Sequence, residues 1–336
     1  MNGVIILDKP AGWTSHDVVS RMRRILQQRS VGHLGTLDPL ATGVLPLVTG
    51  NLTRLAQFYT ASEKTYEGVI RFGFATNTYD ADGDPIGEIR PVAPSLEQLQ
   101  QLAAGFWGLI EQVPPPFSAK KIHGVPAYKL ARKQQEVVLK PVQVEIKEFA
   151  ILSVSADRAT FRARVASGTY MRSIAHEMGR RLGSGAHLES LRRTAVAEFD
   201  IAQVHTLEEI EGQIKEGQTK EGQTREAQLS PCHSEPGGKP GAACPERSRR
   251  EPAVLEAGAN GIAALFIHPR RLLPQFPSVT ADEPTAARIR NGRPVNLPEL
   301  SRARHVKVFH GQSQLIAIAT RVAGTLFHPK IVFPSD

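Results

Sequence analysis

The chain has 336 residues, of which 41% are hydrophobic, a composition typical of a globular protein long enough for two domains. Its formal net charge of +8 favours a polyanionic partner, nucleic acid or an anionic membrane surface, although a merely soluble basic protein fits equally well. No apolar run approaches transmembrane length and the N-terminus shows no signal-peptide pattern, so we expect a cytoplasmic protein. Two cysteines, Cys232 and Cys244, are too few for a disulfide framework.

The first thirty residues predict a short strand followed by an amphipathic helix. Residues 4–7 are all apolar and indicate a buried strand, which the turn residues 10–12 would end. Thr14 suits the N-cap of the helix, and Asp17 suits its first turn, where the macrodipole favours an acid. Apolar residues at helical spacing then extend the predicted helix to about Gln28.

Residues 31–45 carry Asp38 as their only carboxylate, directly before Pro39. A residue that precedes proline is held in extended or turn geometry, and the neighbouring glycines permit a tight backbone. We therefore expect Asp38 and His33 to share one rigid, extended loop. On spacing alone, an Asp-Pro pair is more often a plain turn than a functional site.

Residues 64–74 alternate as a strand, with Tyr66 and Phe72 on one face. A tyrosine in that position is more often part of a core than catalytic. The acidic run 80–84 lacks the glycine and glutamate that an EF-hand loop needs at its sixth and twelfth positions. We therefore expect a hairpin turn at residues 82–83 rather than a calcium site.

Residues 112–140 are markedly basic and interleave aromatic side chains with cations. The cations that we expect to contact a phosphate backbone are Lys120, Lys121, Lys129 and Arg132. Basic and aromatic residues in alternation suit phosphate contact combined with base stacking. Composition alone is equally compatible with an exposed basic excursion.

A strand ending near residue 167 is followed by helical spacing, with Thr169 as the expected N-cap. Arg172 falls in the first turn of this helix, where the macrodipole opposes a cation. We therefore expect a carboxylate partner for Arg172, and Asp38 is the candidate. A further strand is predicted to begin at Leu188.

From residue 211 to 262 the sequence becomes rich in Pro, Gly, Ser and Arg and is expected to be disordered. Cys232, His233 and Cys244 fall short of a structural zinc ligand set, so we expect no metal. Beyond this segment, a helix over 284–289 and several short strands predict a small β domain.

Five segments resemble the TruB-type tRNA pseudouridine synthases. The longest is GTLDPLATGVL at residues 35–45, and the others are LDKPAGWTS at 7–15, KTY at 64–66, SGTYMRS at 167–173 and LESLRR at 188–193. The likeness covers about residues 1–210 and 263–336, and residues 211–262 have no counterpart. The C-terminal strands resemble, more loosely, the RNA-binding PUA domain that ends many members of the family.

The resemblance implies an α+β pseudouridine-synthase fold, with a mixed, largely antiparallel central sheet flanked by helices and a small C-terminal PUA-like β-barrel. It also implies a domain order. The expected segments are a catalytic domain over 1–210 with an RNA-clamping insertion at 112–140, a disordered insertion over 211–262, the end of the catalytic domain at 263–276, and a PUA-like domain over 277–336.

Site residues follow from the same resemblance. Asp38 corresponds to the catalytic aspartate and Arg172 to the arginine that pairs with it, while Tyr66 would lie against the target base. Supporting positions are Tyr170, an apolar contact at Leu191, His33 filling the space of the flipped base, and Lys64 joining the backbone contacts named above. One carboxylate can suffice, because the freed base is recaptured and water must be kept out.

The implied activity is isomerisation of uridine to pseudouridine in the T-loop of tRNA, at position 55. No cofactor is required, and the expected partner is the T-arm stem-loop of tRNA, bound by a monomer with no obligate protein partner. Two alternatives stay open. One is a non-catalytic tRNA-binding or folding module on the same scaffold, which the intact site residues disfavour, and the other is a guide-RNA-dependent synthase, which would need partner proteins.

Overall fold

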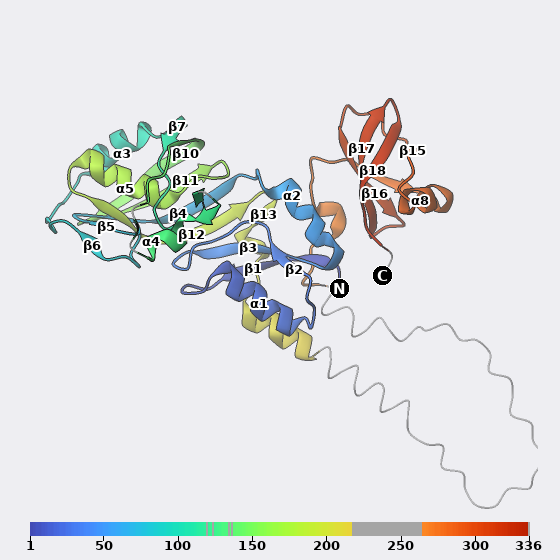
Figure 1. The fold of residues 1–336 in the computed structure, drawn as a ribbon, viewed down its shortest axis with the longest axis horizontal. Coiled ribbons are helices and arrows are strands. Elements are labelled where there is room, and N and C mark those ends of the chain that lie inside the picture. Colours follow the sequence, from blue (N-terminus) through green and yellow to red (C-terminus); the bar gives the residue numbers. More distant parts are fainter. Residues whose placement is uncertain (119, 123, 134, 136, 217–263, 335–336) are drawn as a thin grey trace, which may run out of the picture.

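The computed structural model describes residues 1–216 and 264–334, apart from residues 119, 123, 134 and 136. Within this part of the chain, a nine-stranded sheet forms the larger body and a five-stranded sheet the smaller one (Figure 1). Most of the predicted insertion, including Cys232, His233 and Cys244, lies outside the described residues. No helix that the structure describes is long and apolar enough to cross a membrane.

The large sheet runs in the order β1-β3-β12-β4-β11-β10-β7, with β2 paired to β3 and β13 to β12. Its strands are β1 (Gly3–Lys9), β2 (Val31–His33), β3 (Thr42–Thr49), β4 (Lys64–Phe72), β7 (Gly108–Gln112), β10 (Val142–Ser155), β11 (Arg158–Val165), β12 (Ala186–Val196) and β13 (Phe199–Asp200). The β3–β12 pair is parallel and the other described pairs of this sheet are antiparallel. The predicted mixed, largely antiparallel sheet is therefore confirmed.

This sheet is buried on both faces around β1, which explains the continuous apolar run at its start. Ile5 and Leu7 point into one core, whereas Val4 and Ile6 point into another, as the two-residue period of a strand requires. The first core lies under three helices and residues 207–216, which are also helical. The three helices are α1 (Ser15–Ile25), α3 (Leu96–Ala104) and α5 (Met171–Leu182).

Helix α1 begins as predicted and ends early. The Thr14 hydroxyl accepts from the Asp17 N–H, and the Asp17 carboxylate accepts from the Thr14 N–H, which makes a capping box. The helix ends at Ile25 rather than near Gln28, because Gln27 takes a left-handed φ of 48° that a continuing helix cannot contain.

Helical residues 207–216 correct the expected start of the disordered segment at residue 211. Ile210 and Ile214 are four residues apart, so both face the first core, where each is buried. On the outer side, Glu211 forms an ion pair with Arg21 of α1. The chain therefore remains packed for at least one turn beyond the predicted boundary.

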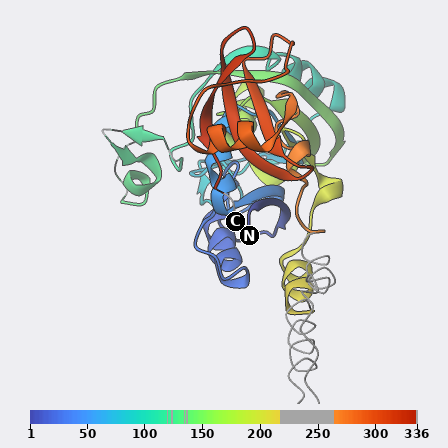
Figure 2. The same ribbon diagram turned by 90° about the vertical axis from the view of Figure 1, so that its right-hand side faces the viewer.

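Two smaller units leave the sheet between β4 and β10. Strands β5 (Ala75–Thr76) and β6 (Pro85–Ile86) form a hairpin whose loop contains residues 82–83, as predicted. Strands β8 (Lys121–Ile122) and β9 (Val125–Pro126) and helix α4 (Ala127–Ala131) form a unit that projects away from the sheet (Figure 2). The central part of the basic segment predicted at residues 112–140 therefore forms a unit that projects from the large sheet.

The C-terminal sheet has the order β14-β16-β17-β18-β15, so β14 and β15 are its edges and it curls into an open half-barrel. This sheet is consistent with the expected PUA-like fold, although the predicted barrel is not closed. Its elements are β14 (Ser278–Ala281), α8 (Glu283–Arg290), β15 (Val295–Asn296), β16 (His305–His310), β17 (Gln314–Ala323) and β18 (Leu326–Val332). Phe309 and Ile318 join the second core of the large sheet, which ties the two sheets together.

Short helices complete the described chain. They are η1 (Gly50–Leu55), α2 (Ala56–Tyr59), η2 (Ile201–Gln203) and η3 (Pro269–Arg271).

Candidate active site

Asp38 lies in the loop between β2 and β3, and that loop is fixed through its backbone. The Ser15 hydroxyl at the start of α1 accepts a hydrogen bond from the Leu37 N–H at 2.8 Å. On the other side of Asp38, the Lys9 ammonium donates to the Pro39 carbonyl at 3.2 Å. Asp38 is therefore presented between two anchored neighbours, as the Asp-Pro pair and the flanking glycines predict.

Arg193 of β12 supports the same loop from below. Its fully buried guanidinium donates to the carbonyls of Val44, Gly35 and Thr36 at 2.8, 3.1 and 3.3 Å. The loop passes so closely that a Cβ at Gly43, where φ is 97°, would lie 2.2 Å from the Arg193 carbonyl. The sequence holds one clue to Arg193. Arg192 and Arg193 are adjacent in a predicted strand, so their side chains project from opposite faces of the sheet, and one of them faces the interior if that face is covered.

Replacing Arg193 by methionine is expected to lower the free energy of unfolding by about 3 kcal/mol, because two carbonyls of the loop and one of β3 lose a charged donor inside the protein. Urea denaturation measures this change. Arg192→Met is the matched control: Arg192 is partly exposed and pairs with Asp8, so its loss should cost under about 1 kcal/mol. Equal losses in both variants would contradict the assigned role of Arg193.

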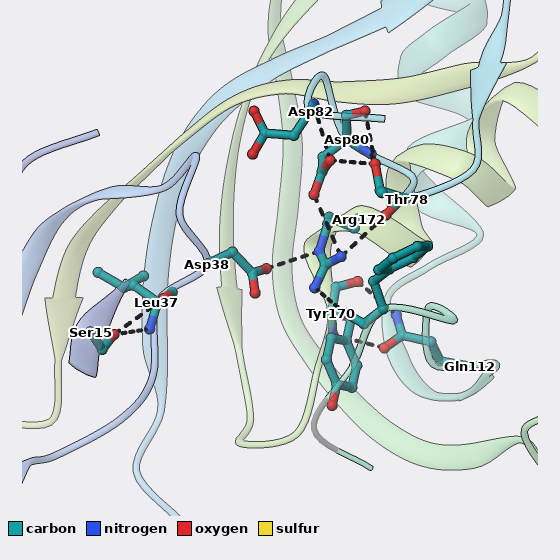
Figure 3. Close-up of polar contacts among 10 residues, drawn as sticks. Ser15, Leu37, Asp38, Thr78, Asp80, Asp82, Gln112, Tyr170 and Arg172 are labelled. Atoms are coloured by element: carbon teal, nitrogen blue, oxygen red, sulfur yellow. Dashed lines mark hydrogen bonds and ion pairs between the residues drawn. The ribbon is translucent and has the colours of Figure 1, made fainter. Parts of the chain in front are cut away.

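The predicted pairing of Asp38 with Arg172 is present. Arg172 Nε lies 2.9 Å from Asp38 Oδ2, and the Arg172 side chain is only 6% exposed whereas that of Asp38 is 38% exposed (Figure 3). The Nε–H does not point at the carboxylate, so the contact is an ion pair without hydrogen-bond geometry. Asp38 is consequently charge-paired on one side and open on the other.

Three further groups surround the Arg172 guanidinium. Asp80 Oδ2 lies 3.5 Å from Nη1, the Thr78 carbonyl accepts from Nη1 at 3.2 Å, and the Phe117 carbonyl accepts from Nη2 at 3.1 Å. Figure 3 shows Asp38 approaching Arg172 from one side, and Asp80 and Thr78 from another. Asp80, whose side chain is 7% exposed, was not among the residues that the sequence singled out. The available clue was that a buried arginine commonly needs more than one acceptor.

The expected N-cap of α5 at Thr169 is wrong. The cap position is Tyr170, and the Thr169 hydroxyl instead donates to the Ala166 carbonyl at 3.0 Å. A side chain from β7 instead binds the backbone of the cap residue: Gln112 Oε1 accepts from the Tyr170 N–H at 2.8 Å, and Gln112 Nε2 donates to the Tyr170 carbonyl at 3.1 Å. This amide clamp fixes the backbone two residues before Arg172, and no local pattern pointed to Gln112.

A groove of about 660 Å³ lies next to the loop of Asp38, although neither Asp38 nor Arg172 is among its lining residues. It is lined by Leu40 from the loop of Asp38, by Thr42 at the start of β3, and by Leu191 of β12. Tyr66 is buried at 8% exposure in the neighbouring strand β4, where it pairs with Arg193 in register. The structure thus brings Leu191 to the groove and places Tyr66 opposite Arg193, the residue that donates to the loop of Asp38.

Burial perturbs several titrating groups around the loop. It lowers the pKa of Lys9 and of Lys64 to about 8, and it lowers the pKa of His33 below its ordinary value. Burial also raises the pKa of Tyr170. The His33 imidazole is half-buried, and its Nδ1 accepts from the Gly35 N–H at 3.3 Å, inside the same loop.

The predicted backbone-contacting cations fall into two places. Lys64 is partly buried beside the loop of Asp38 and donates to the Ser62 carbonyl at 2.6 Å, so it is not grouped with the others. The remaining four are exposed on the projecting unit: Lys120, Lys121, Lys129 and Arg132. Among the residues that the structure describes, no three His, Cys, Asp or Glu side chains gather to hold a metal.

The chain is similar to known pseudouridine synthases along most of its length. The profile of the TruB family pseudouridylate synthase N-terminal domain matches residues 23–171, and that of the tRNA pseudouridylate synthase B C-terminal domain matches residues 172–234. The protein of Solibacter usitatus named tRNA pseudouridine synthase B is 44% identical over 99% of this chain and 100% of its own length. The protein of the same name from Opitutus terrae is 45% identical over 63% of this chain and 88% of its own.

Solved structures share the fold. A chain of an H/ACA RNP bound to a substrate RNA containing 2′-deoxyuridine has a TM-score of 0.64 at 20% identity, covering 99% of this chain and 85% of that one. A chain of a Cbf5-Nop10-Gar1 complex has a TM-score of 0.61 at 23% identity, covering 96% and 79%. Because the matched profiles span more than half of the chain and 44% identity extends over nearly all of it, the chain belongs to the TruB family of pseudouridylate synthases.

Proposed function

We propose that the chain converts uridine to pseudouridine at position 55 in the T-loop of tRNA. The observation that carries the proposal is a single loop carboxylate, Asp38, which is held by a buried arginine and is itself 38% exposed to solvent. Relatives of the chain over most of its length are named tRNA pseudouridine synthase B, which supports tRNA as the substrate class.

The reaction is an isomerisation in which the bond between ribose C1′ and base N1 breaks, the uracil turns, and C1′ bonds to C5. The C5 proton leaves and N1 gains a proton, so atoms and electrons balance without a redox partner. A carboxylate at the sugar–base junction is what this chemistry needs, much as in a retaining glycosidase. The carboxylate can attack C1′, attack the base or abstract a ribose proton. In each of these three mechanisms the reacting carboxylate is Asp38.

The other side chains would serve the flipped nucleotide. A uridine must leave its stack to reach Asp38, at a cost of about a few kcal/mol. Tyr66 would lie against the extruded base and assist removal of the C5 proton, and Leu191 would supply an apolar contact from the groove. His33 would occupy the space that the base leaves, and Tyr170 would close the site beside Arg172.

Contacts to the rest of the tRNA would come from outlying parts of the fold. The exposed cations of the projecting unit β8-β9-α4 would clamp the backbone of the T-arm stem-loop. The C-terminal half-barrel would form a second RNA-binding surface within residues 277–336, and residues 263–276 would form the end of the catalytic domain. The chain would act as a monomer, with no obligate protein partner.

Release of tritium from tRNA labelled at C5 of uridine tests the proposal. The purified chain is expected to release one tritium for each tRNA, and a transcript with cytidine at position 55 should release none. A bare T-arm stem-loop should also be a substrate, which a guide-RNA-dependent enzyme would leave unmodified. If the chain bound tRNA without releasing tritium, it would be a binding or folding module instead.

A further inference from the structure

The loop between β5 and β6 carries two of the partners of Arg172, and its geometry is held by several contacts. Asp80 presents its carboxylate to Arg172 and Thr78 presents its carbonyl. Within the loop, the Thr78 hydroxyl donates to Asp80 Oδ1 at 2.5 Å, and the Thr76 hydroxyl donates to the Asp80 carbonyl at 2.6 Å. Whatever fixes this loop therefore fixes one side of Arg172.

Tyr79, between Thr78 and Asp80, has a left-handed backbone with φ of 68°. A non-glycine residue in that region carries strain of about 1–3 kcal/mol and keeps it only where its surroundings leave no alternative. Backbone bonds to β12 supply one constraint: the Leu188 N–H donates to the Tyr79 carbonyl at 3.0 Å, and the Ala81 N–H donates to the Leu188 carbonyl at 3.0 Å. These bonds tether the loop to the sheet, and they do not tether it to α5, the helix that carries Arg172.

Besides the contacts of Arg172 itself, the loop has an aromatic link to α5. The Tyr79 ring stacks on the His176 ring with a centroid separation of 3.8 Å and an interplanar angle of 13°. His176 is four residues after Arg172, so both side chains project from the same face of the helix. Burial lowers the pKa of His176 and raises the pKa of Tyr79, so two uncharged rings are stacked near neutral pH.

We propose that Tyr79 and His176 are positioning residues whose stacked rings hold the loop against α5. The stack keeps Asp80 and the Thr78 carbonyl on Arg172, and Arg172 in turn holds Asp38 towards the substrate. The strained backbone at Tyr79 is the turn that brings the ring to His176 and the following carboxylate to Arg172. This role rests on the proposed function, because its readout is the rate of pseudouridine formation.

Two ring-deleting variants test the stack. Tyr79→Asn keeps a residue that tolerates the left-handed region and removes the ring, and His176→Ala removes the other ring. Each is expected to slow single-turnover pseudouridine formation by about tenfold while the Kd for tRNA changes by less than about twofold, since the loop shifts but no RNA contact is lost. Tyr79→Phe and His176→Phe retain stacked rings and should stay within about twofold of the parent chain.

The decisive comparison is made in an Asp80→Asn background. If Tyr79 acts through Asp80, then Tyr79→Asn should slow the Asp80→Asn enzyme by less than about twofold, although it slows the parent enzyme about tenfold. Phe74→Leu is the matched control, because the Phe74 ring packs on the His187 ring, with centroids 4.5 Å apart, and not on the His176 ring of α5. Its rate should stay within about twofold of the parent.

Any of the following results would overturn the inference. A parent-like rate in Tyr79→Asn would show that the stack positions nothing, and an undiminished tenfold loss in the Asp80→Asn background would show that Tyr79 acts independently of that carboxylate. A loss in Tyr79→Phe as large as in Tyr79→Asn would assign the effect to the hydroxyl. Failure of the parent chain to modify tRNA at all would instead reject the proposed function, so the two failures are distinguishable.

Discussion

Asp38→Asn is expected to abolish tritium release, with a fall in kcat of about 10⁴-fold or more. The carboxamide has nearly the same shape, but it can neither attack as an anion nor stabilise positive charge at the ribose. Binding of tRNA should stay within about tenfold of the parent chain, because one partly exposed side chain would supply only a small part of an RNA interface. The change thus separates chemistry from recognition.

Single-turnover assays with enzyme in excess, together with filter binding of labelled tRNA, measure both quantities. Asp17→Asn is a suitable control: this carboxylate caps α1 close to the Asp38 loop, is exposed, and has no place in the proposed chemistry. It should leave the rate within about twofold. An Asp38→Asn enzyme that still turned over would remove Asp38 from the catalytic role.

The pair of Asp38 and Arg172 could be predicted because Arg172 is anomalous in its local context and because the segments around both residues resemble the motifs of the TruB-type synthases. The aspartate precedes a proline among glycines, and the arginine stands at the helix end that repels cations. Local rules of this kind also gave Thr14 as the cap of α1. They failed at Thr169: the cap position is Tyr170, and its backbone is held by Gln112 from a distant strand.

The groups that surround this pair could not be predicted in the same way. Asp80 reaches Arg172 only after the β5–β6 hairpin folds back over α5, and the sequence near Asp80 resembles an ordinary acidic turn. Arg193 donates to backbone carbonyls. Because every residue has a carbonyl, no residue type in the sequence identifies the partners of Arg193. The stack of Tyr79 on His176 depends likewise on tertiary packing and on one left-handed backbone. Rules based on the local sequence identify residues that are unfavourable in their own helix or loop. They miss residues whose partners lie in a distant part of the chain.

Arg172→Met is expected to reduce kcat by about 10³-fold and to lower the free energy of unfolding by about 3 kcal/mol. The first effect follows because Asp38 loses the cation that orients it. The second follows because Asp80, almost fully buried, keeps its charge without a partner, and an uncompensated buried charge is costly. Arg172→Lys should recover part of the stability but little of the rate, since an ammonium cannot span Asp38, Asp80 and two carbonyls as a planar guanidinium does.

A second substitution separates the two effects of losing Arg172. Asp80→Asn added to Arg172→Met removes the stranded charge, so urea denaturation should show most of the lost stability restored. Single-turnover kinetics should nevertheless stay about 10³-fold slow, because Asp38 still lacks its orienting partner. If the rate returned along with the stability, Arg172 would serve the fold alone, and the alignment of Asp38 would have to come from Lys9 and Ser15, which anchor its loop on either side.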